Sequence, residues 1–232
     1  MWLDALEPDA PDVVAAFRRL DAGKFISLRR EVRHRAGADS AGRVVSQLAA
    51  IAAALQAITA SLPEAAFSAP GGEGDWTVAE AIGHDADARA GLAMAGALAA
   101  AGKFPADAPS VVPGVPGERA VGRDALVRRI TASQRIVERA SRAIAGHEQD
   151  PCPLEHPWVG RLRCGEWLLF AGVHDLMHLE QLHGIAAQFG SGLAGPANDA
   201  GSEGAGSERT GQDGAEAAAN EATNDAIESD AG

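Results

Sequence analysis

The sequence predicts an all-α protein built as a four-helix bundle. Of its 232 residues, 46% are hydrophobic but only 4% are aromatic, and there is no Tyr. The apolar positions are therefore mainly aliphatic or Ala, which favours closely packed helices over an aromatic-rich β-sandwich. Four separate segments also carry a stripe of residues at alternating steps of three and four, the spacing of one helix face. Helices of this kind bury their stripes against one another, as in a four-helix bundle.

The first two helices of the bundle are predicted over residues 43–62 and from Thr77 to about Gly102. In the second, Thr77 and Glu80 have the spacing of a capping box, in which each side chain hydrogen-bonds to the backbone of the other residue. The stripe of the first helix consists of Val44, Leu48, Ile51, Leu55, Ile58 and Leu62.

The last two helices are predicted over residues 123–146 and 164–189. Gly146 is suited to end the third helix, because glycine readily adopts the left-handed conformation found at helix ends. Between the second and third helices, residues 103–122 contain four prolines and no helical pattern. This segment is long enough to cross the whole length of the bundle. We therefore expect a long crossover there and not a tight hairpin.

Two further regions flank the bundle, which we assign to residues 41–189. Residues 1–40 are predicted to form an N-terminal helical extension, with a short amphipathic helix over residues 13–20 followed by a basic stretch that forms a solvated face. Residues 190–232 carry nine acidic residues against the single base Arg209 and have very few large apolar side chains. Such a composition cannot offset the entropy of ordering, so a disordered acidic tail is predicted.

Composition also argues against several classes of function. The formal net charge of −12 is unfavourable for binding nucleic acid, since clustered Lys and Arg supply most of the affinity for phosphates. There is no uninterrupted run of eighteen apolar residues, and the N-terminus is acidic where a signal peptide would be basic. We therefore expect a cytoplasmic protein that does not enter the membrane. Cys152 and Cys164 are too few for a disulfide scaffold and are expected to be free thiols.

Two histidines occupy positions in the fourth helix where the bundle should have apolar side chains. His174 and His178 are four residues apart and so project from the same helix face. Buried imidazoles need partners, and two histidines at this spacing can supply two nitrogen ligands to a divalent metal ion. His84 in the second helix is a candidate third ligand. The other residues of its face are small, namely Ala81, Ala88, Gly91 and Ala95, so we expect a cavity beside it.

Other polar residues near these histidines have roles that their positions suggest. Gln181 lies one turn beyond His178 and is a candidate for orienting that ligand or contacting substrate. Asp85 and Asp175 each follow a candidate ligand directly and are expected on the solvent side, because one residue turns the helix by about 100°. His156 is read mainly as part of a structural turn, with a substrate contact as the alternative. His183 should lie away from the site.

Three parts of the chain together resemble the DinB-like superfamily. They are a Trp-x-x-x-Glu-x-x-x-His helix start at residues 76–84, an His-Pro-x-x-Gly turn at residues 156–160 and a terminal His-x-x-x-His helix at residues 174–178. The resemblance covers about residues 41–189. It implies a four-helix bundle that binds one divalent metal ion through three histidines, which correspond to His84, His174 and His178. One departure is Cys164, where the family often has a Thr that caps the last helix.

The resemblance also implies a class of reaction. The family includes bacillithiol-dependent thiol S-transferases, mycothiol-dependent maleylpyruvate isomerases and stress-associated proteins without an assigned reaction. We therefore expect a metal-dependent enzyme, most simply a transferase that activates a low-molecular-weight thiol, or water, for attack on a small-molecule substrate. Zinc is the default metal, although nickel, iron and copper also accept nitrogen ligands. A non-catalytic metal-binding module for stress response or interaction is the alternative, and a homodimer is compatible with either.

Overall fold

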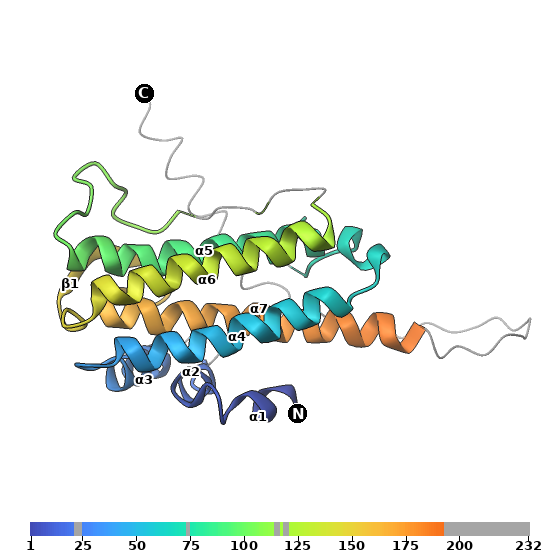
Figure 1. The fold of residues 1–232 in the computed structure, drawn as a ribbon, viewed down its shortest axis with the longest axis horizontal. Helices are drawn as coiled ribbons and strands as arrows, with labels where there is room; N and C mark the ends of the chain where they lie inside the picture. The colour runs from blue at the N-terminus through green and yellow to red at the C-terminus, as the bar shows by residue number, and fades with distance from the viewer. Residues whose placement is uncertain (21–24, 73–74, 114–116, 118–120, 193–232) are drawn as a thin grey trace, which may run out of the picture. The chain divides into compact units, whose positions relative to one another are not determined.

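The computed structural model describes residues 1–20, 25–72, 75–113, 117 and 121–192. Within these residues the chain is mostly helical and carries one small β-hairpin (Figure 1). The predicted acidic tail lies outside the described residues from residue 193 onward. The elements are α1 (Trp2–Leu6), α2 (Pro11–Phe17), α3 (Ile26–Arg35), α4 (Ala41–Ser61), the 3₁₀ helix η1 (Glu64–Ser68), α5 (Val78–Ala100), α6 (Arg123–Ile144), β1 (Pro151–His156), β2 (Gly160–Arg163) and α7 (Cys164–Gly192).

The four predicted bundle helices are confirmed as α4, α5, α6 and α7. Their ends agree with the predicted signals. The Thr77 hydroxyl accepts from the Glu80 amide at 3.2 Å, and the Glu80 carboxylate accepts from the Thr77 amide at 2.8 Å, so the capping box at the start of α5 is formed. Gly146 follows the end of α6 with φ +83°, the left-handed conformation expected of it.

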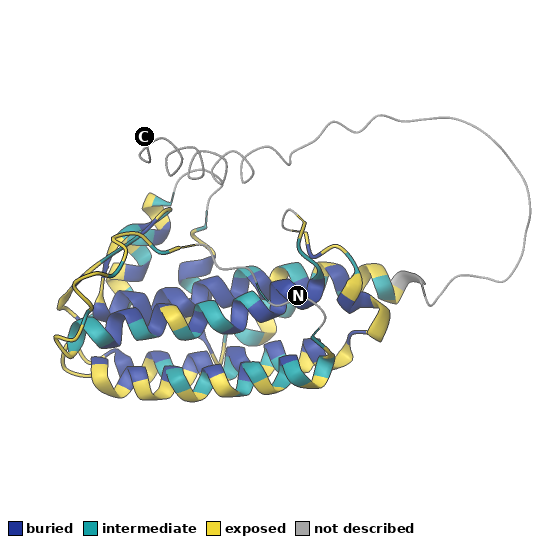
Figure 2. Ribbon diagram, turned by 90° about the horizontal axis from the view of Figure 1, so that it is seen from above, coloured by how far each residue is buried: buried dark blue, intermediate teal, exposed yellow. Residues whose placement is uncertain are grey.

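The start of α7 does not need the Thr that the family often has there. The helix begins at Cys164, and the carboxylate of Glu166 accepts from the backbone N–H of Arg163 at 3.0 Å. This bond satisfies one of the donors that every helix leaves open at its N-terminus. The six stripe residues predicted for the first bundle helix are all buried, and the other bundle helices also carry many buried residues (Figure 2).

Contacts between the bundle helices establish their directions. Arg129 of α6 bonds to Asp87 of α5, and further along both helices Ile144 of α6 lies against Gly96 of α5, so α5 and α6 run parallel. Two parallel neighbours require a connection that returns along the whole bundle, and this confirms the predicted crossover over residues 103–122 (Figure 1). In contrast, α7 runs antiparallel to α5, because Cys164 at its start lies against Gly96, whereas His178 lies beside His84.

The crossover is held against the rest of the fold at two places. Its Val112 amide donates to the carbonyl of Glu155 in β1 at 2.9 Å, and the Glu155 amide donates to the carbonyl of Ser110 at 2.8 Å. Further on, Gly117 lies so close to the backbone of Glu80 and His84 that no Cβ would fit there. The crossover therefore touches α5 next to a candidate ligand.

The structure adds a small β-hairpin to the predicted helical bundle. Strands β1 and β2 are antiparallel, with His156 paired to Gly160. The predicted His-Pro-x-x-Gly turn is therefore real, and it connects two strands. The segment is too short and too rich in turn residues for periodicity alone to identify strands.

The N-terminal extension packs directly on the bundle. Val13 and Val14 of α2 and Leu28 and Val32 of α3 are buried in the same hydrophobic core as the bundle helices. Space for this contact comes from Gly172 of α7, where an added Cβ would lie 2.9 Å from Val13 and 2.6 Å from Leu48. The helix expected over residues 13–20 corresponds to α2, which begins earlier, at Pro11, and ends earlier, at Phe17, and the basic stretch continues into α3.

Helix α7 is enclosed more completely than the other bundle helices. Every residue from 164 to 176 is buried, because α5 and α4 cover it on two sides and α2 covers it on a third. Among the described helices, α4 alone is long and apolar enough by length and composition to cross a membrane. Its apolar stripe is buried within the bundle, as in any core helix of this type.

Candidate metal centre

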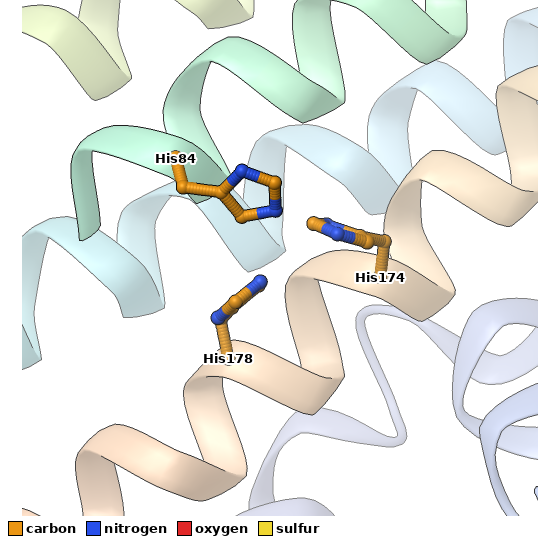
Figure 3. Close-up of side chains that lie close together, drawn as sticks. All are labelled: His84, His174 and His178. Carbon is orange, nitrogen blue, oxygen red and sulfur yellow. The ribbon is translucent and has the colours of Figure 1, made fainter. Parts of the chain in front are cut away.

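The three predicted histidine ligands converge between α5 and α7. His84 comes from α5 and His174 and His178 from α7, and the three rings face one another (Figure 3). Ring centroids are 5.3 Å apart for His84 and His174, 5.3 Å for His84 and His178, and 4.7 Å for His174 and His178. One nitrogen of each ring lies within 4.8 Å of the others. Such a cluster could hold one metal ion.

Gln181 orients the ring of His178. The Gln181 side chain donates from Nε2 to the carbonyl of Gly71, so its Oε1 faces Nδ1 of His178, at 2.9 Å. An oxygen in this position can only accept, and Nδ1 of His178 must therefore carry the proton. Nε2 of His178 is then the lone-pair nitrogen, as a metal ligand requires. Gln181 therefore lies directly behind His178, one of the three candidate ligands.

Asp85 has a similar position behind His174. Its Oδ1 lies 3.6 Å from Nδ1 of His174, and both side chains are buried. A carboxylate there favours the proton on Nδ1 and leaves Nε2 free. Burial lowers the pKa of His174 to about 4, against the opposing effect of Asp85. The ring is therefore neutral at neutral pH, which is the form that binds metal.

Replacing Asp85 with Asn should weaken metal binding. An amide lacks the charge that holds the proton on Nδ1 of His174, so affinity is expected to fall by roughly 10–100-fold. Competition titration against a chromophoric chelator measures the change. Asp87→Asn is the matched control, since Asp87 pairs at the surface with Arg129. Equal affinities for the wild type and Asp85→Asn would show that the carboxylate does not support the ligand.

A buried network lies behind the histidines, and the sequence reasoning missed it. Arg89 of α5 and Asp175 of α7 are both fully buried, with Arg89 Nε 3.0 Å from Asp175 Oδ2. The guanidinium also donates to the Leu48 carbonyl and to Gln134 Oε1, each at 3.1 Å. Asp85 and Asp175 were expected on the solvent side, and this expectation is wrong. The reason is that α5 and α7 each pack against several neighbouring elements, so a turn of 100° leads to another buried face.

The charges of this network suit a cation beside it. Two buried carboxylates, Asp85 and Asp175, face the single guanidinium of Arg89. Burial raises the pKa of the Asp175 carboxyl well above its ordinary range, with Arg89 opposing the shift and Asp85 adding to it. Both oxygens of Asp85 and Oδ1 of Asp175 have no hydrogen-bond partner among the described residues. A positive charge at the histidines would offset this excess of buried acidic groups.

A second group of potential ligands overlaps the first. Asp85, His174 and Asp175 also bring one potential ligand atom each within 4.8 Å of the others. However, Asp175 already binds Arg89, whose charge would repel a cation held there. The three histidines carry no such opposing charge, and they are therefore the better metal site. Asp85 would then lie behind the candidate ligand His174, and Asp175 would remain paired with Arg89.

The surroundings of His84 differ from the predicted cavity. The Trp76 ring lies 4.8 Å from the His84 ring, centroid to centroid, and Gly117 of the crossover approaches the His84 backbone. On the small-residue face, Gly91 is exposed and Ala95 is buried in helix packing. This face therefore does not line a single cavity. The aromatic ring and the crossover backbone are the neighbours that a ligand at His84 would meet.

The remaining histidines lie outside the three-histidine cluster. His183 stacks on Trp2 of the N-terminal extension, with 5.0 Å between ring centroids, in agreement with its predicted place away from the site. His156, at the end of β1, is buried against Phe170 of α7, with 4.7 Å between centroids. Burial, with a smaller effect from His174, lowers the pKa of His156 to about 4.

This pKa predicts how the stability of the metal-free protein depends on pH. The folded-state pKa of His156 lies below the ordinary value of 6.5, so the unfolded chain binds more protons between pH 6.5 and 4. Stability is thus complete above pH 6.5 and falls as the pH drops through this window, by about 3 kcal/mol for this one residue. Urea unfolding of the wild type and His156→Phe from pH 7 to pH 4 tests this. The His156→Phe variant should lose less free energy of unfolding than the wild type over this pH range. An equal loss in the two proteins would contradict the lowered pKa of His156.

Comparison with known proteins supplies the family. No match was found among curated proteins or among solved structures. The family model of the DinB superfamily matches residues 47–182, more than half of the chain. The matched segment includes the three clustered histidines together with Gln181 and His156. Since the fold is a helical bundle and the match spans its four main helices, the chain belongs to the DinB superfamily.

Proposed function

We propose that this protein is a divalent-metal-dependent enzyme that activates a low-molecular-weight thiol, or water, at His84, His174 and His178. The convergence of three imidazoles from two helices supports this proposal most strongly. Three neutral ligands leave at least one coordination position for an exogenous molecule, as in catalytic and not in structural sites. A bound divalent cation would lower the pKa of a thiol or water at that position, so that the nucleophile forms at neutral pH.

Zinc is the metal that we propose, since three nitrogen ligands and an open position suit it well. Nickel, iron and copper also accept imidazole ligands. Residues behind the three histidines would fix the orientation of the ligand rings. Asp85 and Gln181 would hold the rings of His174 and His178 with Nε2 directed inward. The buried network of Arg89 and Asp175 would keep α5 and α7 in register behind them.

The thiol in this proposal comes from outside the chain. Cys152 and Cys164 are both free and buried. Burial raises the pKa of Cys164 to about 11 and also raises the pKa of Cys152, so neither is a thiolate at neutral pH. A small thiol cosubstrate would lose its S–H proton and form an S–C bond to the electrophile, whose leaving group departs with its bonding electrons. We place this chemistry in the cytoplasm, where such thiols are kept reduced.

A conjugation assay tests the proposal. The zinc-loaded protein is mixed with cysteine, glutathione or bacillithiol and with 1-chloro-2,4-dinitrobenzene, and formation of the S–C bond is followed by absorbance. We expect a rate above that of the metal-free protein, lost in His84→Ala and retained in His183→Ala. Hydrolysis of activated esters without conjugation would favour water as the nucleophile. A protein that binds metal but catalyses neither reaction would instead be a non-catalytic metal-binding module.

A further inference from the structure

The outer side of α6 carries four exposed arginines, which we call the arginine face. They are Arg128, Arg135, Arg139 and Arg142. Their spacings of seven, four and three residues place them on one side of the helix. At the rise of an α-helix, the arginine face extends over about 21 Å. Helix α6 is strongly basic as a whole, since it contains six arginines and only two acidic residues.

The arginine face has no acidic partner among the described residues. Exposed arginines elsewhere in the described chain do have one. Arg18 Nη1 lies 2.6 Å from Glu7 Oε1, and Arg161 Nε lies 2.5 Å from Glu155 Oε1. In contrast, no described carboxylate forms an ion pair with any arginine of the arginine face. The neighbouring helix α4 contains no acidic residue that could neutralise these charges. The four guanidinium groups are therefore available to an anionic group from outside the fold.

Helix α4 adds an uncharged surface beside the arginine face. Gln56 of α4 donates to Thr131 Oγ1 of α6 at 3.1 Å, and Arg123 of α6 donates to the Leu62 carbonyl at 2.7 Å, so the two helices are antiparallel neighbours. The exposed residues of α4 include Ala49, Ala53, Ala57 and Ala60. Small side chains at a contact allow another helix to approach closely. The pair of helices thus combines a row of positive charges with a surface that suits a helix backbone.

We propose that α4 and α6 form a docking surface for an acidic α-helical segment of a partner protein. The carboxylates of that helix would pair with the arginine face, because a guanidinium group can bind a carboxylate through two hydrogen bonds. Carboxylates at steps of three and four residues would match the spacing of the arginines. The uncharged side of the same helix would lie on the alanines of α4, as when an amphipathic helix binds in a groove. This surface does not depend on the metal site and goes beyond the proposed function.

Two other anionic partners fit this surface less well. Binding to a membrane surface favours Trp, Phe or Leu beside the basic residues, whereas the large exposed apolar side chains of the described chain are Met1, Ile26 and Val111, which lie outside α4 and α6. Single-stranded nucleic acid favours aromatic side chains for base stacking, and neither helix contains one. The formal net charge of −12 would also repel a long polyanion. A helix with a few carboxylates meets all of these conditions.

Binding of an acidic peptide tests the proposal. The probe is a fluorescein-labelled synthetic peptide of three Glu-Ala-Ala-Glu-Ala-Ala-Ala repeats, and its binding to the full-length protein is followed by fluorescence anisotropy. We expect saturable binding that weakens as salt is added, because salt screens exposed charges. Combining Arg135→Glu with Arg139→Glu should lower the affinity by roughly 10-fold or more, since two attractive pairs become repulsive.

The matched control combines Arg30→Glu with Lys103→Glu. Both residues are exposed and lie outside α4 and α6, and the net charge changes by the same amount. This control should bind the peptide with an affinity close to that of the wild type. An equal loss in the two double variants would show a general effect of charge and would refute the docking surface.

Further outcomes test the two helices and the class of partner. No peptide binding by the wild type, or equal affinities in the wild type and the Arg135→Glu/Arg139→Glu variant, would overturn the proposal. Ala53→Gln should weaken binding, because a larger side chain on α4 keeps the helix at a distance. An unchanged affinity in Ala53→Gln would remove α4 from the surface. Tighter binding of polyuridylate or of phosphatidylglycerol vesicles than of the peptide would overturn the assignment to a protein partner.

Discussion

Replacement of Arg89 by Met is expected to lower the free energy of unfolding by about 3–5 kcal/mol. The guanidinium is fully buried and bonds to Asp175, to Gln134 and to the Leu48 carbonyl, so it joins its own helix α5 to the other three bundle helices. Met has a similar length but no charge. The substitution would leave two buried carboxylates without their cation and would remove the donors to two further groups. Urea unfolding of the metal-free protein measures the loss.

Two control variants show whether buried charge causes this loss. Arg129→Met removes a partly exposed arginine that pairs with Asp87, and it should change stability by only about 0–1 kcal/mol. Combining Arg89→Met with Asp175→Leu removes both partners of the buried pair, and it should recover part of the loss. An Arg89→Met protein as stable as Arg129→Met would mean that the network contributes little to the fold.

Zinc is expected to stabilise the folded chain strongly. At a free zinc concentration about 1,000 times the dissociation constant, binding to the native state alone adds about 4 kcal/mol to the free energy of unfolding. Three imidazoles whose potential ligand nitrogens lie within 4.8 Å of one another would provide the site, and the unfolded chain does not hold them together. Thermal unfolding with zinc and with a chelator measures the difference. His84→Ala should abolish the stabilisation, whereas His183→Ala should retain it.

If zinc left the unfolding temperature of the wild type unchanged, the three histidines would not form a binding site in the native state. An equal increase in the wild type and His84→Ala would point to binding elsewhere on the chain. Either outcome separates metal binding at the cluster from a general effect of zinc on the protein.

Much of the fold could be predicted from sequence because four helices carry regular stripes and recognisable ends. The capping box at Thr77 and the glycine at position 146 lie where the helices begin and end. The crossover was also predictable, because its prolines exclude a helix. The hairpin at residues 151–163 was not, since its strands are short and its contacts with α5 and with the crossover are distant in sequence.

The three histidines could be predicted because each interrupts a helix face that should be apolar or small. The network behind them could not be predicted by the same reasoning, which assumed that α7 has one buried face. In the structure α5, α4 and α2 all pack on α7, and Asp175 is buried against Arg89 of α5. Two features of the sequence nevertheless indicated this buried network. Residues 167–179 are apolar on nearly all sides, as expected of a fully enclosed helix, and Arg89 is the single basic residue in α5.

The central claim is that His84 and His174, from two helices, bind the same metal ion. Metal content by plasma mass spectrometry, on untagged wild type, His84→Ala and His174→Ala proteins, tests this claim most directly. We predict about one equivalent of divalent metal in the wild type and loss of the metal in both variants. A wild type without metal, or a metal content unaffected by either substitution, would contradict the claim and leave the buried histidines with a purely structural role.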